Sequence, residues 1–531
     1  MSIGKIILDY FKIHKLKALA IVLIVAIAAV AAILPAQVLR IIVDDAIPSE
    51  KAIKLLQISL VYVLTYVLVG VTTFIKDIIM LGTSQHIIMK IRSNMMKHIE
   101  KLSYRELVKT DAGSLEAFFN NDINSINELF TAGVIDMITD SFKIIGIVVS
   151  IFIYSVRLGL VLLLILPFLI LFTSIVRKRM LKAQLKTKKL EGNVNKMLLE
   201  NVECIEQVKV NKAENYAKEK YDEILKGHFK ANQASNFYDA IFSPIMQITR
   251  SLVICFVLLL SGYNANIFGL TTGMIISSLS LVTDLFSPIE NLGTEIQTIQ
   301  KSVAAVKRIN SFFKMEKEVE KEDVKLNNFV ITYDHVSFAY EEAIVIKDFN
   351  LVIKEGEKVA FQGPSGSGKS TLMKLALGLI NPQKGSVTIG GFPNFKLGSN
   401  TRKDIFAIVY QEPFFSGGTI YEEITLLDNS ITKEEVRKSL DEVGLGHITN
   451  LDIKLKPNEY STGELALLNI ARIIVKNSKI IFLDEMNAKI DPVTASNIIK
   501  LINKIAKDKT VISINHYGET LENARIIRLV N

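Results

Sequence analysis

The sequence predicts two parts of different fold class: an N-terminal all-α transmembrane domain with six helices, and a C-terminal α/β domain on a mainly parallel sheet. Three observations predict this division. Long apolar runs fill the first part, charged helix-patterned segments separate some of them, and short β-type runs alternate with helical stretches in the last part. We place the transmembrane domain at 1–313, a charged linker at 314–328 and the α/β domain at 329–531.

Composition agrees with apolar segments joined to charged ones. The 531 residues are 49% apolar and 22% charged, with a mean hydropathy of +0.32. The net charge of +8 is best explained by basic loops that face the cytoplasm. Aromatic residues do not alternate with a basic patch, so we expect no nucleic-acid partner. Cys204 and Cys255 lack the spacing of a disulfide or metal framework.

Six apolar runs each approach the ~20 residues that a bilayer-spanning helix needs. The runs are Ala18–Leu34, Ile58–Ile75, Ile144–Val156, Leu158–Val176, Ile241–Tyr263 and Ile267–Ile289. The third is short unless its helix extends back through Lys143 and Asp140. The first is too long for a signal peptide and lacks a cleavage site, so we expect it to be retained.

Two of the connections are long, about fifty residues after the second span and about sixty-five after the fourth, and such lengths are uncommon for structureless loops. Both are charged and helix-patterned, so we expect helices that continue out of the membrane. They also carry most of the basic residues, which places them, the N-terminus and the C-terminal domain in the cytoplasm. The segment Ser2–Lys15 has the pattern of an amphipathic helix on the inner membrane surface.

A glycine-rich segment, GPSGSGKST, follows the strand-like run KVAFQ and precedes the apolar helix LMKLALGLI. In this context the backbone N–H groups of the loop and of the helix N-terminus can surround phosphate oxygens. Lys369 would reach the β- and γ-phosphates, and the Ser370 hydroxyl would bind Mg²⁺. The predicted ATP-binding residues of this loop are Gly363, Pro364, Ser365, Gly366, Ser367, Gly368, Lys369, Ser370 and Thr371.

The run KIIFLDE, Lys479 to Glu485, reads as an apolar strand that ends in two carboxylates. Asp484 suits Mg²⁺, and Glu485 suits a base that polarises water against the γ-phosphate. Alone, the run is equally well explained as an acidic strand end that leads into a turn. The preceding phosphate loop favours the catalytic interpretation.

These residues resemble the ATP-binding cassette (ABC) family, and the resemblance covers the whole chain. Six spans followed by one cassette, with long connections after spans two and four, resemble a half-size ABC exporter. Leu102–Ile126 resembles the first intracellular loop, whose tip docks on the cassette, and Val208–Tyr221 resembles the second. The resemblance implies an ATPase coupled to export.

The family's cassette roles are implied at four further positions. Tyr340 matches the aromatic that stacks on adenine, and Gln411 matches the lid glutamine that senses Mg²⁺ and the membrane part. Asp491 resembles the aspartate of the loop across the dimer interface, and His516 the histidine that contacts the γ-phosphate. A core tyrosine and a surface histidine are the alternatives for Tyr340 and His516.

The segment YSTGE stands where the family has Leu-Ser-Gly-Gly-Gln, which caps the ATP held by the other cassette of a dimer. Ser461 and Gly463 match, whereas Thr462 adds a β-branched side chain and Glu464 places a carboxylate near a polyanion. The arginine that the family has shortly afterwards is absent, and the helix offers only Arg472. We therefore expect a weakened cap, either in a homodimer with two slow sites, which we favour, or in a heterodimer with another half-transporter.

Four ionisable residues within or beside the spans are candidates for the substrate cavity: Asp140 and Lys143 in the third, Arg250 in the fifth and Asp284 in the sixth. Ion pairs that fix packing, such as Arg250 with Asp140 or Asp284, explain them equally well. If these side chains line a cavity, it suits a polar or zwitterionic cargo such as a modified peptide.

Together these features predict ATP-driven export across a bacterial cytoplasmic membrane by alternating access of a dimer, with ATP and Mg²⁺ as cofactors. The predicted partners are a second half-transporter, membrane lipid and a small-molecule or peptide substrate. Two alternatives stay open: an ATP-gated regulatory or channel subunit with little hydrolysis, and a lipid flippase.

Overall fold

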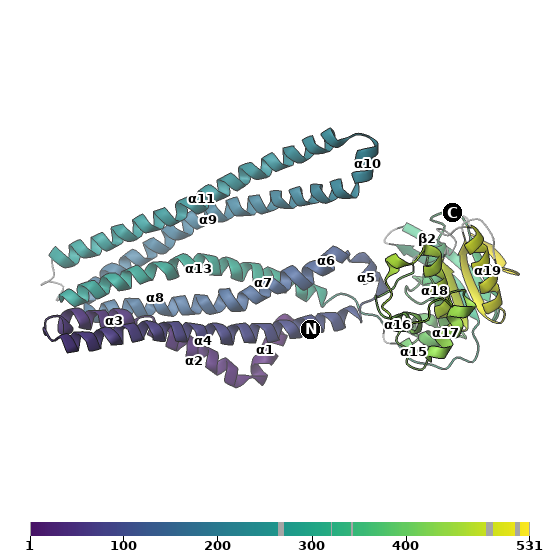
Figure 1. Cartoon of the computed structure of the whole chain (residues 1–531), viewed down its shortest axis with the longest axis horizontal. Helices are drawn as coiled ribbons and strands as arrows, with labels where there is room; N and C mark the ends of the chain where they lie inside the picture. The colour runs from purple at the N-terminus through teal and green to yellow at the C-terminus, as the bar shows by residue number, and fades with distance from the viewer. Residues whose placement is uncertain are drawn as a thin grey trace. The chain divides into compact units, whose positions relative to one another are not determined.

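The computed structural model describes residues 2–263, 270–319, 321–340, 343–411, 413–484, 492–515 and 521–529. The chain forms two compact units (Figure 1). The first comprises Met1–Glu100 and Asp111–Met315, and the second comprises Lys101–Thr110 and Glu316–Asn531. The short stretch between residues 101 and 110 thus belongs structurally to the second unit, although it lies between two helices of the first.

The first unit is helical throughout its described residues. Its elements are α1 (Ile3–Ile13), α2 (Lys15–Ala31), α3 (Leu34–Ile41), η1 (Ile42–Ala46), α4 (Ala52–Ile99), α6 (Ala112–Ala117), η2 (Phe118–Asp122), α7 (Ile123–Glu128), η3 (Leu129–Gly133), α8 (Val134–Tyr154), α9 (Val156–Glu203), α10 (Ile205–Val210), α11 (Glu214–Tyr263) and α13 (Thr272–Phe312). Within the described residues, six helical stretches are long and apolar enough to cross a membrane. The predicted six-helix transmembrane domain is confirmed.

The long helices explain the long connections. Helix α4 has 48 residues, which gives it a length of about 72 Å, more than twice the ~30 Å of a bilayer's hydrocarbon core. Helix α9 has the same length and α11 has 50 residues. The third membrane stretch runs from Gly113 to Tyr154, so its helix does extend back through Lys143 and Asp140.

The predicted amphipathic segment at the N-terminus is helix α1, and Ser2 caps it by accepting from the Lys5 backbone N–H. Its apolar face, however, packs on protein. Ile3, Ile6 and Tyr10 are buried, α1 contacts α4 and α13, and the Ile3 N–H donates to Asn310 Oδ1 at 2.9 Å. This face is therefore used within the first unit.

The second unit contains two sheets. Its elements are α5 (Tyr104–Lys109), β1 (Ile331–Tyr340), β2 (Ala343–Ile353), β3 (Lys358–Gln362), α14 (Lys369–Ala376), β4 (Lys384–Ile389), β5 (Phe392–Pro393), η4 (Asn394–Lys396), α15 (Ser399–Ile405), β6 (Phe406–Val409), α16 (Ile420–Thr425), α17 (Lys433–Glu442), η5 (Pro457–Glu459), α18 (Thr462–Lys476), β7 (Ile480–Asp484), α19 (Pro492–Ile505), β8 (Thr510–Asn515) and β9 (Arg525–Arg528). One sheet has the order β6-β7-β8-β3-β9, and all its pairs are parallel.

The other sheet, β2-β1-β4-β5, is antiparallel. The sequence predicted one mainly parallel sheet, so this second sheet is an addition to the prediction. Its cause is local: β1 ends at Tyr340 and β2 begins at Ala343. A crossover between parallel strands needs about a dozen residues, whereas a hairpin needs only two.

Helix α14 connects the two sheets through one core. Its residues Leu372, Met373 and Leu375 are buried together with Tyr333 of β1 and Phe482 of β7. A second core lies on the other side of the parallel sheet and includes buried residues of α16, α17, α18 and α19. The phosphate loop is thus held by the first core, and the YSTGE segment by the second.

The linker pairs with the stretch that precedes α5. The Ser103 N–H donates to the Glu316 carbonyl at 3.0 Å, and the Glu318 N–H donates to the Lys101 carbonyl at 2.9 Å. These bonds form a short antiparallel bridge between Leu102 and Lys317. The bridge accounts for the membership of α5 in the second unit.

Candidate functional site

The loop between β3 and α14 has the backbone geometry that close approach of a phosphate requires. Gly366 and Gly368 have φ values of +84° and +88°, in the left-handed region that favours glycine. A Cβ on Gly368 would lie 2.5 Å from Ile346 Cδ1, so no other residue fits there without displacement. Helix α14 begins at Lys369, and its N-terminal N–H groups are available to an anion.

Two buried polar groups of this loop point to an anionic ligand. The Lys369 side chain is buried, and its Nζ donates to the carbonyls of Gly363 at 2.8 Å and Pro364 at 2.9 Å. The hydroxyl of Ser367 is buried without a hydrogen-bond partner among the described residues. A buried hydroxyl without a partner is costly, and a phosphate oxygen would satisfy it. The loop therefore fits the triphosphate of ATP.

Asp484 and Gln411 lie at the same edge of the parallel sheet as this loop. Asp484 ends β7 and is level with Ile514 of β8, and Ile514 is in turn level with Phe361 of β3. Two strand spacings, about 10 Å, therefore separate the backbones of Asp484 and Phe361. Gln411 follows β6, which pairs with β7, and it is exposed.

The oxygen-bearing groups at this edge fit a magnesium ion. Ser370 is exposed in the first turn of α14, and Asp484 is half-buried. Hydroxyl, carboxylate and amide oxygens are the ligands that Mg²⁺ takes in nucleotide sites. Ser370, Asp484 and Gln411 are thus the residues that would hold the ion beside the phosphates.

The remaining predicted site residues lie outside the phosphate loop or outside the described residues. Tyr340 ends β1 in the antiparallel sheet and is 44% exposed, and the Phe338 ring stands edge-on to it at 4.8 Å between centroids. The predicted catalytic residues Glu485 and His516, and the interface residue Asp491, lie outside the described residues.

The YSTGE segment forms the N-terminus of α18 and is closed by a reciprocal capping box. Both the N–H and the hydroxyl of Ser461 donate to Glu464 Oε2 at 2.8 Å, and the Glu464 N–H returns a bond to Ser461 Oγ at 3.2 Å. These bonds lower the pKa of Glu464. The hydroxyl that the resemblance assigns to a γ-phosphate is thus already held by an ionised side chain of its own helix.

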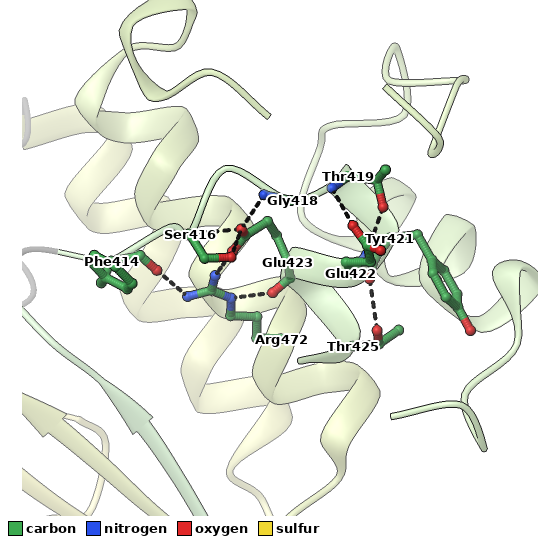
Figure 2. Close-up of polar contacts among 9 residues, drawn as sticks. All are labelled: Phe414, Ser416, Gly418, Thr419, Tyr421, Glu422, Glu423, Thr425 and Arg472. Carbon is green, nitrogen blue, oxygen red and sulfur yellow. Dashed lines mark hydrogen bonds and ion pairs between the residues drawn. The ribbon is translucent and has the colours of Figure 1, made fainter. Parts of the chain in front are cut away.

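Sequence reasoning missed the role of Arg472, which is shown in Figure 2. Its Nη2 lies 2.9 Å from Glu423 Oε2, its Nε donates to the Glu423 carbonyl at 2.6 Å, and its Nη1 donates to the Phe414 carbonyl at 3.0 Å. The guanidinium also lies over the Phe415 ring, 4.3 Å from its centroid. The sequence did contain a signal for an ion pair of Arg472, because this residue interrupts the apolar run LALLNIARIIV. A buried charge needs a partner.

The partner carboxylate is itself fully satisfied. Glu423 is 3% exposed, and its second oxygen accepts from the Ser416 N–H at 2.8 Å, the Ser416 hydroxyl at 2.5 Å and the Gly418 N–H at 2.9 Å (Figure 2). Arg472 belongs to α18, whereas Phe414 and Ser416 follow Gln411 by only a few residues. This cluster thus fixes the segment that follows Gln411 to α18, the helix that Ser461 caps.

The charges within the spans are arranged differently from the suggested ion pairs. Among the described residues, neither Asp140 nor Asp284 lies within ion-pair distance of Arg250. Asp140 instead accepts from Asn291 Nδ2 at 3.1 Å, and Lys76 forms ion pairs with Asp136 at 2.8 Å and with Asp77 at 3.4 Å. The Arg250 ion pairs that were the example of the packing alternative are thus not formed among the described residues. Asp140, Lys143, Arg250 and Asp284 are all half-buried.

A bundle of six membrane helices, joined to an α/β unit with a phosphate-binding loop, defines a membrane transporter driven by a nucleoside triphosphate. The family comparisons agree with this class. The ABC transporter transmembrane region matches residues 18–289, and the ABC transporter cassette matches residues 346–488. The chain therefore belongs to the ABC transporter family, and as a half-size exporter it is an ATPase that couples hydrolysis to transport.

Individual relatives and a solved structure agree with the assignment. The uncharacterized ABC transporter ATP-binding protein YknV of Bacillus subtilis is 26% identical over 92% of this chain and 83% of its own length. The ATP-dependent lipid A-core flippase of Francisella tularensis subsp. holarctica is 26% identical over 86% of this chain and 77% of its own. The structure of a bacterial Atm1-family ABC exporter with ATP bound covers 97% of this chain and 93% of its own, with a TM-score of 0.79 and 21% identity, which shows the shared fold.

Proposed function

We propose that this chain is one half of a dimeric exporter in the cytoplasmic membrane of a bacterium, and that it moves a polar or amphipathic molecule such as a modified peptide. The proposal that ATP drives export rests on the phosphate loop. This loop has glycines with left-handed backbone conformations, a buried Lys369 and, among the described residues, a Ser367 hydroxyl without a hydrogen-bond partner. The basic cytoplasmic extensions support an orientation with both termini in the cytoplasm.

In the proposed cycle, two cassettes close head to tail around ATP. Lys369 leaves its two carbonyl partners to bind the phosphates, and Ser461 and Gly463 of the other cassette cap them. Ser370, Asp484 and Gln411 would hold Mg²⁺, which would supply positive charge beside the phosphates. Glu485 then activates the attacking water. Tyr340 stacks on adenine throughout.

His516 and Asp491 complete the proposed site, with His516 at the γ-phosphate and Asp491 at the interface between cassettes. Closure favours the outward-facing conformation because ATP binds the closed dimer more tightly than the open one. Hydrolysis removes that difference and returns the transporter to the inward-facing state.

The proposed cargo class depends on the half-buried charges of the bundle. Asp140, Lys143, Arg250 and Asp284 present both signs of charge, which suits a zwitterionic molecule better than an uncharged one.

Measurements of ATP hydrolysis and of transport distinguish the exporter from its two alternatives, the ATP-gated regulatory subunit and the lipid flippase. In proteoliposomes, the wild type should hydrolyse ATP, and both Glu485→Gln and Lys369→Ala should reduce the rate by about a hundredfold or more. The Lys369→Ala protein should in addition lose ATP binding. A wild type as inactive as Glu485→Gln, with no vectorial movement of a zwitterionic peptide, would favour the ATP-gated regulatory subunit. Movement of lipid alone would favour the flippase.

A further inference from the structure

Helices α8 and α13 lie side by side in the first unit (Figure 1) and bring two carboxyl groups together. Glu295 of α13 is only 4% exposed, and no N–H or O–H group of the described residues donates to its buried Oε2. The Asp140 carboxyl of α8 faces the Glu295 side chain within hydrogen-bonding range. Asp140 also accepts from Asn291 Nδ2 at 3.1 Å, one helical turn before Glu295. The polar neighbour of a buried carboxyl group is thus another carboxyl group.

Helix α8 adds a third carboxyl group, Asp136, which also faces Glu295 and lies one helical turn before Asp140. This carboxylate has a cation of its own, because Lys76 of α4 donates to Asp136 Oδ1 at 2.8 Å. Lys76 also lies 3.4 Å from Asp77, so its charge is shared between two carboxylates. Lys76 therefore does not compensate a negative charge on the pair of Asp140 and Glu295.

Arg177 of α9 is the cation that faces Glu295, but its hydrogen bonds go to other groups. Its guanidinium donates to the Glu290 carbonyl and to the Thr294 hydroxyl. Arg250 of α11 faces the Glu290 carboxylate. These two cations are therefore engaged around Glu290 and Thr294, and among the described residues neither donates to Glu295.

The remaining cation of α8 near the pair, Lys143, faces Asp284 of α13. The pair of Asp140 and Glu295 is therefore a place in the described bundle where two carboxyl groups meet without a hydrogen bond from a cation. Two ionised carboxylates are unfavourable together in such a place, because like charges repel and a buried oxygen lacks a donor.

One monovalent cation with hydrogen to donate removes both costs. A proton on either carboxyl group supplies the donor that a hydrogen bond between two carboxyl groups requires. An ammonium group has three N–H donors and can bond both carboxylates at once. A divalent metal fits less well, because it takes six or more oxygen ligands and no group of three acidic, histidine or cysteine side chains among the described residues is arranged to hold one.

We propose that Asp140 and Glu295 hold one proton between them and exchange it for a primary ammonium group of the cargo. The proposal rests on the proposed function, because Asp140 is one of the residues proposed to line the cargo cavity. In the exchange, the N–H groups of the cargo bond to both carboxylates, the carboxyl O–H bond breaks, and the proton leaves to water. The net charge of the site is unchanged, and a proton binds again when the cargo leaves. The cargo class thus narrows to molecules that carry a primary amine.

Infrared spectroscopy of the full-length protein in detergent tests the shared proton. At pH 7 the wild type should show the carbonyl band of a protonated carboxyl group, shifted to lower frequency in heavy water, and both Glu295→Gln and Asp140→Asn should abolish this band. The matched control is Glu290→Gln on the same helix, which should keep the band because Glu290 faces Arg250. A wild type without the band, or a band that survives in either of the first two variants, overturns the proposal.

The exchange is tested with hexylammonium chloride, and hexanol is the control of equal chain length without the charge. Saturating hexylammonium should remove the band and release about one proton per chain to a pH-indicator dye, whereas hexanol should do neither. A band that persists in hexylammonium, or equal proton release from Glu295→Gln, overturns the exchange. Failure of the proposed function is distinguishable. Lys369→Ala should abolish ATP hydrolysis and leave the band in place, and a wild type without ATPase activity would refute the exporter whatever the infrared result.

Discussion

At the scale of single residues, Glu464 has two effects on the cap that we propose its segment offers to another chain. Its carboxylate repels a phosphate, and it also occupies the Ser461 hydroxyl at 2.8 Å. A glutamine can still accept from the Ser461 N–H, so the helix keeps its capping box while the charge is removed. Charge at a helix N-terminus is worth about 1 kcal/mol, so we expect Glu464→Gln to raise ATPase activity about fivefold.

The measurement is the steady-state ATPase rate at saturating ATP, repeated in a Ser461→Ala background. If the carboxylate acts by holding that hydroxyl, its replacement should have a much smaller effect once the hydroxyl is gone. An equal gain in both backgrounds would show that Glu464 acts through charge alone. No gain in either would refute the weakened cap.

Arg472 makes a second prediction at this scale, on stability. Its removal leaves Glu423 buried with an uncompensated charge, which typically costs about 3–5 kcal/mol. We expect Arg472→Ala to lower the free energy of unfolding of the second unit by that amount, as measured by urea denaturation. Lys433→Ala is the control, because Lys433 forms an even shorter ion pair, 2.7 Å from Asp452, between exposed side chains. The loss of that pair should cost at most about 1 kcal/mol. Equal losses for the two variants would contradict the buried-pair argument.

At the scale of secondary-structure elements, three helices of the second unit begin with the same N-terminal capping motif. Helices α16, α17 and α18 each have a capping box, closed by Glu422, Glu435 and Glu464. In each, hydrogen bonds from the capping Thr or Ser, the backbone N–H first, lower the pKa of the glutamate below 4.5. A glutamate whose pKa is lower in the folded state stabilises that state at pH values above its unfolded-state pKa. This stabilisation is lost as the pH falls through the folded-state pKa.

We therefore expect the thermal midpoint of the second unit to be insensitive to these groups at neutral pH and to fall with acidification below about pH 4.5. The double variant Glu422→Gln with Glu435→Gln should reduce that acid dependence while keeping the boxes. Scanning calorimetry from pH 7 to pH 3.5 measures it. An unchanged acid slope would mean that other carboxylates dominate.

The same scale shows what the sequence could predict. The spans, the phosphate loop and the strand before Asp484 are each encoded in a continuous segment, so periodicity and motif spacing find them. The capping box at Ser461 is also local, and the pattern Ser-x-x-Glu announces it. Contacts between distant segments are different. The Glu423–Arg472 pair spans 49 positions, and the docking of α5 beside the linker spans more than two hundred.

The antiparallel sheet shows why strand pairing could not be predicted from the sequence. The runs that form β1, β2 and β4 are strand-like in sequence, but strand pairing depends on which partners the chain brings together. Only the two-residue gap between Tyr340 and Ala343 carried a local hint of the hairpin. The edge that carries the phosphate loop and Asp484 was nevertheless predictable, since the loop follows one strand of the parallel sheet and Asp484 ends another.

At the scale of the whole molecule, the remaining question is which chain faces this one. In the proposed cycle, the phosphate loop, Tyr340, Gln411 and Asp484 serve the ATP of their own cassette, whereas Ser461 serves the ATP of a second cassette. A complete ATP site in this proposal therefore needs two cassettes. A homodimer uses the same weakened cap twice, and a heterodimer uses it once.

A cross-link between the two half-sites decides between these assemblies. We expect Ser365→Cys in the phosphate loop and Thr462→Cys in the cap to form a disulfide between two copies, because both positions are exposed and the closed dimer would bring them together. Cys204 and Cys255 are exposed, so both are first changed to serine, and Glu485→Gln prevents hydrolysis. Copper-catalysed oxidation should give a covalent dimer with ATP and none without it, and Lys369→Ala should abolish it. A protein that binds ATP but stays monomeric on a denaturing gel would show that the second cassette belongs to a different chain.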